Sequence, residues 1–297
     1  IRRPRGSTRP AGAGGAGGNK RQLWESGDLG YTRRRSGRTW GGGVYPGTSL
    51  PNAMGQVSPV TMYRSGAGYQ YEDTVIFGFT HTNKGHWNLC HVPILPFTGQ
   101  ADPENYYSTY NHDNESASPG YYPVFLERYN VNPEMTSTLP CAFHNFTYKM
   151  EDDKKLLADL NRSNEMVRDW KIDQAGDNVF TGYQQTGETI YFYAVSNYKI
   201  SGIDSVKNEN KTLPVVNFAD SQGDDPLLLK IGFSFVSIEN AKENLDTEIN
   251  DRSFAQIRGF ATETWENLLS KIRVYGGTEM QKETFYSCLY RAFLWPA

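Results

Sequence analysis

Residues 78–96 bring together several side chains that could do chemistry. Polar and aromatic residues lie here between two apolar runs, and they are His81, Asn83, His86, Trp87, Asn88, Cys90 and His91. Polar loops that are flanked by strands are frequent locations of binding residues. These residue types allow a metal site, a stacking surface for a ligand or a hydrogen-bonded loop.

The metal alternative rests on the three histidines and the cysteine of this stretch. The candidate ligands are His81, His86, Cys90 and His91. Their spacings match neither the histidine pair on one helical face of zinc proteases nor the paired cysteines of structural zinc sites. We therefore interpret the histidines as hydrogen-bonding groups of a polar loop and assign no metal ligand.

Trp87 is the second candidate in this stretch. Gly85 gives the preceding backbone freedom, and the polar residues His86 and Asn88 flank the indole. An amphipathic ring of this kind can stack on a sugar face while its neighbours bond the hydroxyl groups. The competing interpretation is a core tryptophan, although tryptophan is rarely buried completely.

Residues 63–69 have the sequence YRSGAGY, a glycine-rich turn with an arginine and two tyrosines. It is not a phosphate loop, because the lysine and the start of a helix are missing. Arg64 could form a forked contact with hydroxyl groups or a carboxylate. An ion pair of Arg64 with Glu72 or Asp73 is the structural alternative.

Acid–base candidates are not specified by any spacing. Glu115, Glu134, Asp152 and Asp153 could act as acids or bases, but nothing pairs them, and solvated surface carboxylates are the default. The sequence also has no nucleophile elbow. We therefore assign no catalytic residue within these 297 residues.

The elements that must position these residues are mainly strands. The chain contains 19 Tyr, 15 Phe, 6 Trp and 29 Gly, a composition that favours strands and turns. Apolar residues alternate with polar ones around residues 146–150 and 229–235, and residues 121–127, 154–160 and 189–196 are further strand candidates. Many short strands with frequent turns predict an antiparallel β-sandwich over residues 44–238.

The period changes after residue 238. Apolar residues recur every three or four positions from Phe254 to Ile272, which predicts an amphipathic helix. Ser253 with Gln256 has the pattern of a capping box at its start, and Thr278 with Gln281 repeats it before a second stripe. We expect residues 239–297 to form linker helices and the start of a helical domain that is truncated here.

The amino terminus differs from the rest of the chain. Residues 1–39 contain nine Arg and Lys20 against Glu25 and Asp28, so the remainder holds 20 basic and 31 acidic residues. Residues 1–43 are interpreted as a disordered or non-native basic leader. The acidic body argues against a nucleic-acid partner. No apolar run is long enough for a membrane span, and no signal peptide is visible.

Cysteines give little information on the fold. Cys90, Cys141 and Cys288 are too few for a disulfide framework, although one pair, such as Cys90 with Cys141, stays open.

An ordered series of motifs resembles glycoside hydrolase family 92, whose members include bacterial α-mannosidases described as α-1,2-mannosidases. The series is VYPGTSLPNAMGQVSP at 44–59, GYQY at 68–71, GFTHT at 78–82, ESASPGYY at 115–122, EMTST at 134–138, GFSFVS at 232–237 and FYSCLY at 285–290. Each motif alone is unspecific, but their order over residues 44–297 is specific. Residues 1–43 do not resemble the start of the family.

The resemblance implies a two-domain enzyme in which a β-sandwich packs on a helical (α/α)6 barrel. Such enzymes are calcium-dependent, inverting exo-α-mannosidases, and calcium lies at the domain interface. The catalytic acid and base come from the helical domain and would therefore lie beyond Ala297. Inversion requires two carboxyl groups that are far enough apart to admit a water molecule.

We therefore predict the N-terminal, carbohydrate-contacting part of an enzyme that removes terminal α-mannose from N-glycan-type mannosides. The predicted substrate contacts are Trp87, His86, Arg64 and Tyr63. The expected partners are the mannoside and a C-terminal helical catalytic domain, and the expected location is periplasmic or secreted. The alternatives are a stand-alone carbohydrate-binding sandwich without catalysis and a structural module in which Trp87 belongs to the core. Linkage preference is not predicted.

Overall fold

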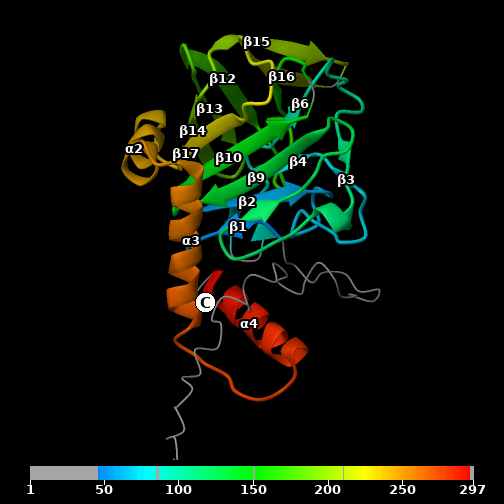
Figure 1. Cartoon of the computed structure of the whole chain (residues 1–297). Helices are drawn as coiled ribbons and strands as arrows, with labels where there is room; N and C mark the ends of the chain where they lie inside the picture. The colour runs from blue at the N-terminus through cyan, green and yellow to red at the C-terminus, as the bar shows by residue number, and fades with distance from the viewer. Residues whose placement is uncertain (1–45, 85–86, 150, 210, 295–297) are drawn as a thin grey trace, which may run out of the picture.

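Two antiparallel sheets form the body of the computed structural model, which describes residues 46–84, 87–149, 151–209 and 211–294 (Figure 1). The basic leader predicted at 1–43 lies outside these residues. The first sheet has the order β1 (Thr48–Ser49), β2 (Gly55–Val60), β4 (Gly78–Lys84), β6 (Ile94–Phe97), β11 (Lys155–Ala158), β16 (Thr212–Phe218) and β15 (Ile200–Lys207). A short strand, β5 (Trp87–Asn88), pairs with the end of β4.

The second sheet covers the other side of the core. Its order is β12 (Asp169–Gly176), β13 (Val179–Gln185), β14 (Thr189–Ser196), β17 (Leu227–Ser234), β10 (Cys141–Tyr148), β9 (Val131–Ser137) and β8 (Tyr122–Pro123). A small ribbon of β3 (Val75–Ile76) and β7 (Ser108–Thr109) and a 3-10 turn, η1 (His112–Asn114), complete this part. The predicted antiparallel sandwich is therefore confirmed.

The core between the sheets is rich in aromatic rings. Buried side chains from both sheets form one cluster, with Phe79 and Phe97 from the first sheet and Phe146, Phe192 and Phe233 from the second. Many of the aromatic rings of the sequence lie in this core, where large rings bury much apolar surface.

Helix α2 (Ile238–Glu248) follows the last strand directly and packs on the outer face of the second sheet, against β17 and β14. Gly232 of β17 allows this close approach, because a Cβ atom there would lie 2.1 Å from the carbonyl oxygen of Ala241. Leu245 and Ile249 complete the contact with Cys141 and Phe143. The second sheet is therefore covered on both faces near its centre.

Two longer helices follow, and both begin with the predicted capping boxes. Helix α3 (Phe254–Leu269) has reciprocal bonds between Ser253 and Gln256. Helix α4 (Glu279–Leu294) has the same pair of bonds, since Gln281 N–H donates to Thr278 Oγ1 and Thr278 N–H donates to Gln281 Oε1. The helix prediction from these caps is confirmed.

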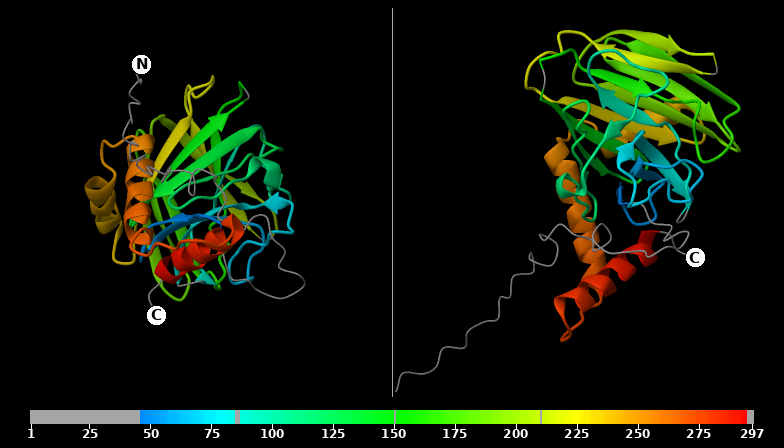
Figure 2. Two further views of the ribbon diagram at one scale, coloured as in Figure 1. Left: turned by 60° about the horizontal axis from the view of Figure 1, so that its bottom comes forward. Right: turned by 90° about the vertical axis from the view of Figure 1, so that its right-hand side faces the viewer.

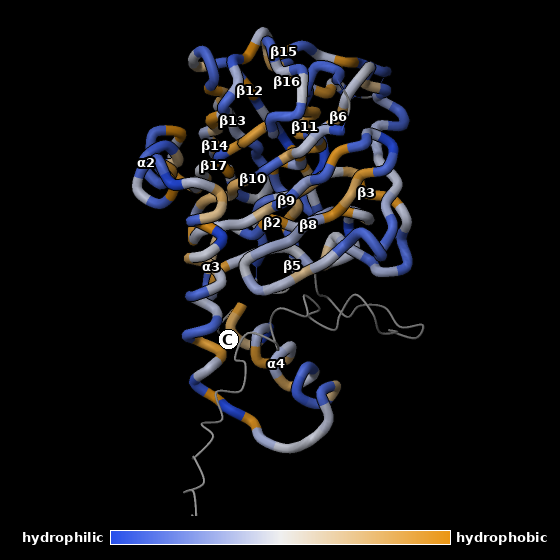
Figure 3. The backbone as a smooth tube through the Cα atoms, in the orientation of Figure 1, coloured by the Kyte–Doolittle hydropathy of each residue, from blue (hydrophilic) through white to orange (hydrophobic). Residues whose placement is uncertain are grey.

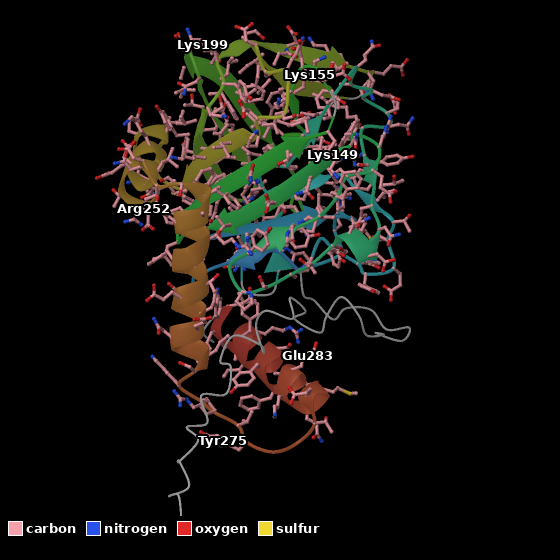
Figure 4. The ribbon with its side chains drawn as sticks, viewed as in Figure 1. Lys149, Lys155, Lys199, Arg252, Tyr275 and Glu283 are labelled. Carbon is pink, nitrogen blue, oxygen red and sulfur yellow. The ribbon has the colours of Figure 1, made fainter. Side chains whose placement is uncertain are left out.

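Helix α3 runs along one side of the sandwich and extends beyond it, and α4 folds back beneath (Figure 2). Trp265 of α3 contacts both the sandwich and α4. Its Nε1–H donates to the Ser49 carbonyl of β1 at 2.7 Å, and its ring packs against Tyr290 of α4. Leu50 and Ala53 belong to the same buried cluster. Tyr275, on the connection between the helices, is 86% exposed, at the end away from the sandwich (Figure 4).

Some local predictions differ from the structure. Residues 121–127 were expected to form one strand, but only β8 is a strand, and isolated bridges join Glu115 to Val124 and Leu126 to Val131. The neighbouring segment bonds to these residues through single hydrogen bonds instead of a continuous ladder, such as Ser116 N–H to the Pro123 carbonyl and Phe125 N–H to the Asn114 carbonyl. Phe235 is 39% exposed and lies beyond β17 rather than within the predicted alternation.

Candidate functional site

The hairpin of β4 and β5 places Trp87 at the edge of the first sheet. Lys84 pairs with Trp87 and Asn83 with Asn88, so β4 and β5 run antiparallel. The Trp87 side chain is 41% exposed, which excludes the core interpretation. β5 lies at the edge of the sandwich that faces α4 (Figure 3). His86, the predicted hydroxyl contact, lies outside the described residues.

The glycine-rich turn lies directly against this hairpin. Asn88 N–H donates to the Gly66 carbonyl at 2.8 Å. A Cβ atom at Gly66 would lie 3.5 Å from Cζ3 of Trp87, so the indole packs on the turn. At Gly68, with φ of +72°, a Cβ atom would lie 2.8 Å from Cys90 Sγ. Glycine at position 68 thus satisfies both a left-handed backbone and a close contact.

A third segment, residues 163–165, ties the turn to the hairpin. Asn164 Oδ1 accepts from the backbone N–H of Arg64, and Asn164 Nδ2 donates to the Asn88 carbonyl at 2.6 Å. Ser163 Oγ donates to the Leu89 carbonyl at 2.6 Å. Sequence reasoning did not identify Asn164, because no motif marks an asparagine whose two bonds reach residues far away in the chain.

Arg64 and Tyr63 lie in the turn that packs against Trp87, but they face different environments. Arg64 is exposed and has φ of +62°, and within the described ranges its guanidinium forms no salt bridge with Glu72 or Asp73. The Tyr63 hydroxyl is buried and has no hydrogen-bond partner among the described residues. Burial raises the pKa of Tyr63 well above its usual value. Their substrate contacts stay predictions.

His81 faces inward rather than into a loop, which corrects the expectation that residues 78–96 form one polar loop. It lies in β4, is fully buried, and its ring lies 4.9 Å from that of Phe233. His81 Nδ1 donates to the Val92 carbonyl at 2.8 Å, so Nε2 accepts from His144 Nε2–H at 2.9 Å. Burial lowers the pKa of His81 to about 3. Burial likewise holds the pKa of His144 well below its usual value.

His91 is also buried and bonded on both ring nitrogens. Thr186 Oγ1 donates to Glu165 Oε2 at 2.6 Å and accepts from His91 Nε2–H at 3.1 Å, so His91 Nδ1 accepts from Thr82 Oγ1 at 2.7 Å. Burial lowers the pKa of His91 to about 4, against the opposing effect of Glu165. Both described histidines of residues 78–96 are therefore buried in the interior, with hydrogen bonds on both ring nitrogens.

Glu115 is buried, which corrects its interpretation as a solvated surface carboxylate. Its side chain accepts hydrogen bonds from Tyr69 Oη at 3.1 Å and Tyr122 Oη at 2.5 Å. His112 Nδ1 lies 2.6 Å from Glu115 Oε2, and His112 Nε2 lies 2.6 Å from the Tyr71 carbonyl. Both ring nitrogens of His112 face acceptors, and the bond to Glu115 raises its pKa. The group holds neighbouring loops together.

The remaining candidates are outside this cluster. Glu134 accepts from Tyr121 Oη and Asn145 Nδ2, whereas Asp152 and Asp153 are exposed. Cys90 and Cys141 are free thiols, and burial raises the pKa of each to about 12. Across residues 46–294, apart from the undescribed positions, no three His, Cys, Asp or Glu side chains are grouped to hold a metal. No described helix is long and apolar enough to cross a membrane.

The candidate site is the exposed indole of Trp87, whose hairpin is hydrogen-bonded to the glycine-rich turn and to Asn164. Trp87 offers a flat apolar face, and the glycine-rich turn that contains the exposed Arg64 packs against the indole at Gly66. Such a surface suits stacking on an apolar ring face with hydrogen bonds at its rim.

Comparison with known proteins assigns this architecture to a family. The model of the glycosyl hydrolase family 92 N-terminal domain matches residues 31–269. The match therefore includes residues 31–43, which corrects the expectation that the resemblance starts at residue 44. A family 92 α-mannosidase from Bacteroides thetaiotaomicron superposes with a TM-score of 0.79 at 28% identity, over 86% of this chain and 39% of that chain. The same enzyme has also been solved in complex with mannoimidazole.

Two further relatives agree with this assignment. An inverting family 92 mannosidase from Bacteroides thetaiotaomicron VPI-5482 has the same fold, with a TM-score of 0.76 at 24% identity over 86% of this chain and 37% of that one. An uncharacterized secreted glycosidase from Arthroderma benhamiae is 24% identical over 92% of this chain and 42% of its own length. The chain thus spans about two fifths of the length of these relatives. The predicted resemblance is confirmed, and the chain belongs to glycoside hydrolase family 92, of which it carries the N-terminal domain.

Proposed function

We propose that this chain is the carbohydrate-contacting part of an inverting exo-α-mannosidase that removes terminal α-mannose from N-glycan-type mannosides. The observation that carries the proposal is Trp87, an exposed indole on a hairpin that is bonded to two other segments. Aromatic side chains that are ordered before the ligand arrives lose little entropy on binding. The mannoimidazole complex of the similar Bacteroides enzyme supports a mannose-like ligand.

The proposed roles follow from the position of each residue. Trp87 stacks on the sugar, and His86 bonds its hydroxyl groups. Arg64 contributes a forked donor from the adjoining turn. Tyr63, from the same turn, is proposed as a further substrate contact through its ring.

The acid and base of an inverting reaction are proposed to come from a C-terminal helical domain beyond Ala297. In an inverting enzyme one carboxylic acid protonates the leaving oxygen, and a second carboxylate activates a water molecule. We assign neither role to a described residue, because Glu115 is already bonded to two tyrosines and a histidine. By this proposal, the chain alone binds but does not hydrolyse.

Calcium is proposed as the cofactor of the whole enzyme, at the interface between the domains. Calcium takes six to eight oxygen ligands, often carboxylates. The described residues contain no group of three His, Cys, Asp or Glu side chains, so they do not fit a carboxylate-rich site of this kind. We therefore name no calcium ligand in this chain, and no step here depends on the ion.

Export to the periplasm or the cell exterior is proposed for the whole protein. The fungal relative is described as a secreted glycosidase, which supports this location.

Hydrolysis of 4-nitrophenyl α-mannoside tests the proposal. The protein that contains this domain together with its helical domain should hydrolyse it with calcium and lose activity with EDTA. Proton NMR should show β-mannose as the first product. The 297-residue chain, checked for folding by circular dichroism, should give no turnover.

Each other outcome has a defined meaning. Turnover by the 297-residue chain would contradict the assignment of acid and base to the helical domain. An inactive whole protein that still binds mannose would favour the carbohydrate-binding module. Hydrolysis of other glycosides without action on α-mannosides would refute the proposed substrate.

A further inference from the structure

We propose that Asn164 is a positioning residue that holds the Trp87 hairpin and the Arg64 turn in one fixed arrangement. This inference rests on the proposed function, since it concerns the geometry of the same sugar-contacting surface. Asn164 itself is buried and is not proposed to touch the substrate.

The two arms of the Asn164 amide reach two segments that are distant in the sequence. The Oδ1 atom accepts from Arg64 N–H, across 100 residues of chain, and the Nδ2 atom donates to the Asn88 carbonyl, across 76 residues. Asn164 N–H also donates to the Leu89 carbonyl at 3.0 Å. One side chain therefore fixes the separation between the two loops that carry the predicted sugar contacts.

The chemistry of the position selects an amide. One arm needs an acceptor and the other a donor, and the side-chain amide of Asn or Gln supplies both on one short planar group. Aspartate would place a carboxylate oxygen against the Asn88 carbonyl, where two acceptors face each other in a buried place. Leucine would fill a similar volume but would leave the Arg64 N–H and the Asn88 carbonyl without their hydrogen-bond partner, which costs free energy.

The Arg64 turn needs such an external bond. Arg64 has φ of +62°, a left-handed conformation that is unfavourable for a residue with a Cβ atom. The bond from its N–H to Asn164 opposes relaxation to an ordinary backbone. Loss of the bond would free the turn on which the Trp87 ring rests.

The segment that carries Asn164 is itself anchored. Ser163 Oγ donates to the Leu89 carbonyl and accepts from Glu165 N–H at 3.1 Å. Glu165 accepts from Thr186, which accepts from the buried His91. The segment that carries Asn164 is thus hydrogen-bonded to buried residues of the sandwich, and Asn164 in turn bonds to the two exposed loops.

The test compares Asn164→Asp, Asn164→Leu and Asn164→Gln in the full-length enzyme. Hydrogen exchange of peptides covering residues 62–68 and 87–90 should rise in the Asp and Leu variants, while β10 and β17 stay protected. KM for 4-nitrophenyl α-mannoside should rise about tenfold, the equivalent of losing one or two hydrogen bonds, with kcat changed less. Asn164→Gln should recover part of the loss.

Asn197 provides a matched control. It makes the same pair of backbone bonds, from Nδ2 to the Pro226 carbonyl at 3.0 Å and from Leu228 N–H to Oδ1 at 2.8 Å, but it lies at the second sheet and is more exposed. Asn197→Leu should raise exchange only near its own loop and leave KM unchanged.

The outcomes separate the two claims. If Asn164→Leu leaves exchange and KM as in the wild type while Trp87→Ala raises KM, the positioning role is wrong and the sugar surface stands. If exchange rises but neither Asn164→Leu nor Trp87→Ala changes KM, Asn164 holds the loops and the proposed sugar surface is wrong. A uniform rise of exchange over the whole sandwich would also overturn the proposal, because it would indicate general destabilisation.

Discussion

Two regions that are adjacent in sequence have opposite surroundings. The interior region contains His81 and His91, which are buried and bonded on both ring nitrogens. The edge region contains the Trp87 hairpin and the Arg64 turn, where the indole is 41% exposed. Saturated, buried polar groups stabilise a fold, whereas fixed and exposed groups are available to a ligand. Substitutions in the interior should therefore change stability, and those at the edge should change activity.

The largest effect should come from acidification of the interior histidines. The unfolded pKa of histidine is about 6.5, and the folded pKa of His81 is lowered to about 3. The unfolded chain therefore binds more protons below pH 6.5, so the stability is present above this pH and is lost as the pH falls. At pH 5 each such histidine should cost about 2 kcal/mol of unfolding free energy.

Urea denaturation between pH 7.5 and 5 measures this loss. His144→Asn should flatten the profile, because one buried titrating group is removed. His112→Asn should change it in the opposite direction, since the pKa of His112 is raised and its contribution is lost as the pH rises. A wild-type profile without slope over this range would contradict the account of the interior.

An intermediate effect is expected at Gly68, where the two regions meet. Gly68→Ala places a Cβ atom 2.8 Å from Cys90 Sγ and imposes a left-handed backbone on alanine. The expected loss is about 2 kcal/mol of stability, together with a higher KM. Gly99→Ala is the control, because Gly99 has φ of +76° and no atom within 4 Å of the added Cβ. Equal losses in the two variants would show that the contact with Cys90 is unimportant.

The smallest effect on stability is expected at Arg64. Arg64→Gly relieves the left-handed conformation and should change the unfolding free energy by less than about 1 kcal/mol. KM for the aryl mannoside should still rise, because the guanidinium is lost. An unchanged KM in Arg64→Gly would show that Arg64 does not contact the substrate. Arg64→Lys keeps the charge but not the forked donor group. Equal KM values for the wild type and Arg64→Lys would therefore argue only against forked binding.

Local signals in the sequence predicted part of this structure. The capping boxes at Ser253 and Thr278 depend on residues three positions apart, and both helices begin there. The inward position of His81 was missed, because residues 78–83 of β4 are all buried and show no alternation. Helix α2 was not identified individually, since only Ala241 and Leu245 of its residues are buried.

The parts of the site that were missed depend on contacts between distant segments. Trp87 and Arg64 could be named from their residue types and neighbouring glycines. Asn164 joins them across 76 and 100 residues, and Glu115 is buried by tyrosines 46 residues before and 7 residues after it. A single sequence contains no local pattern for such partners.

The catalytic efficiency of Trp87→Ala in the full-length enzyme tests the central claim that this edge contacts the sugar. Loss of a stacking indole should lower kcat/KM for 4-nitrophenyl α-mannoside about 100-fold, while the melting temperature stays close to that of the wild type. Phe235→Ala, which removes an aromatic ring that is 39% exposed at the end of β17, should have no such effect. A Trp87→Ala enzyme with wild-type kcat/KM would contradict the account.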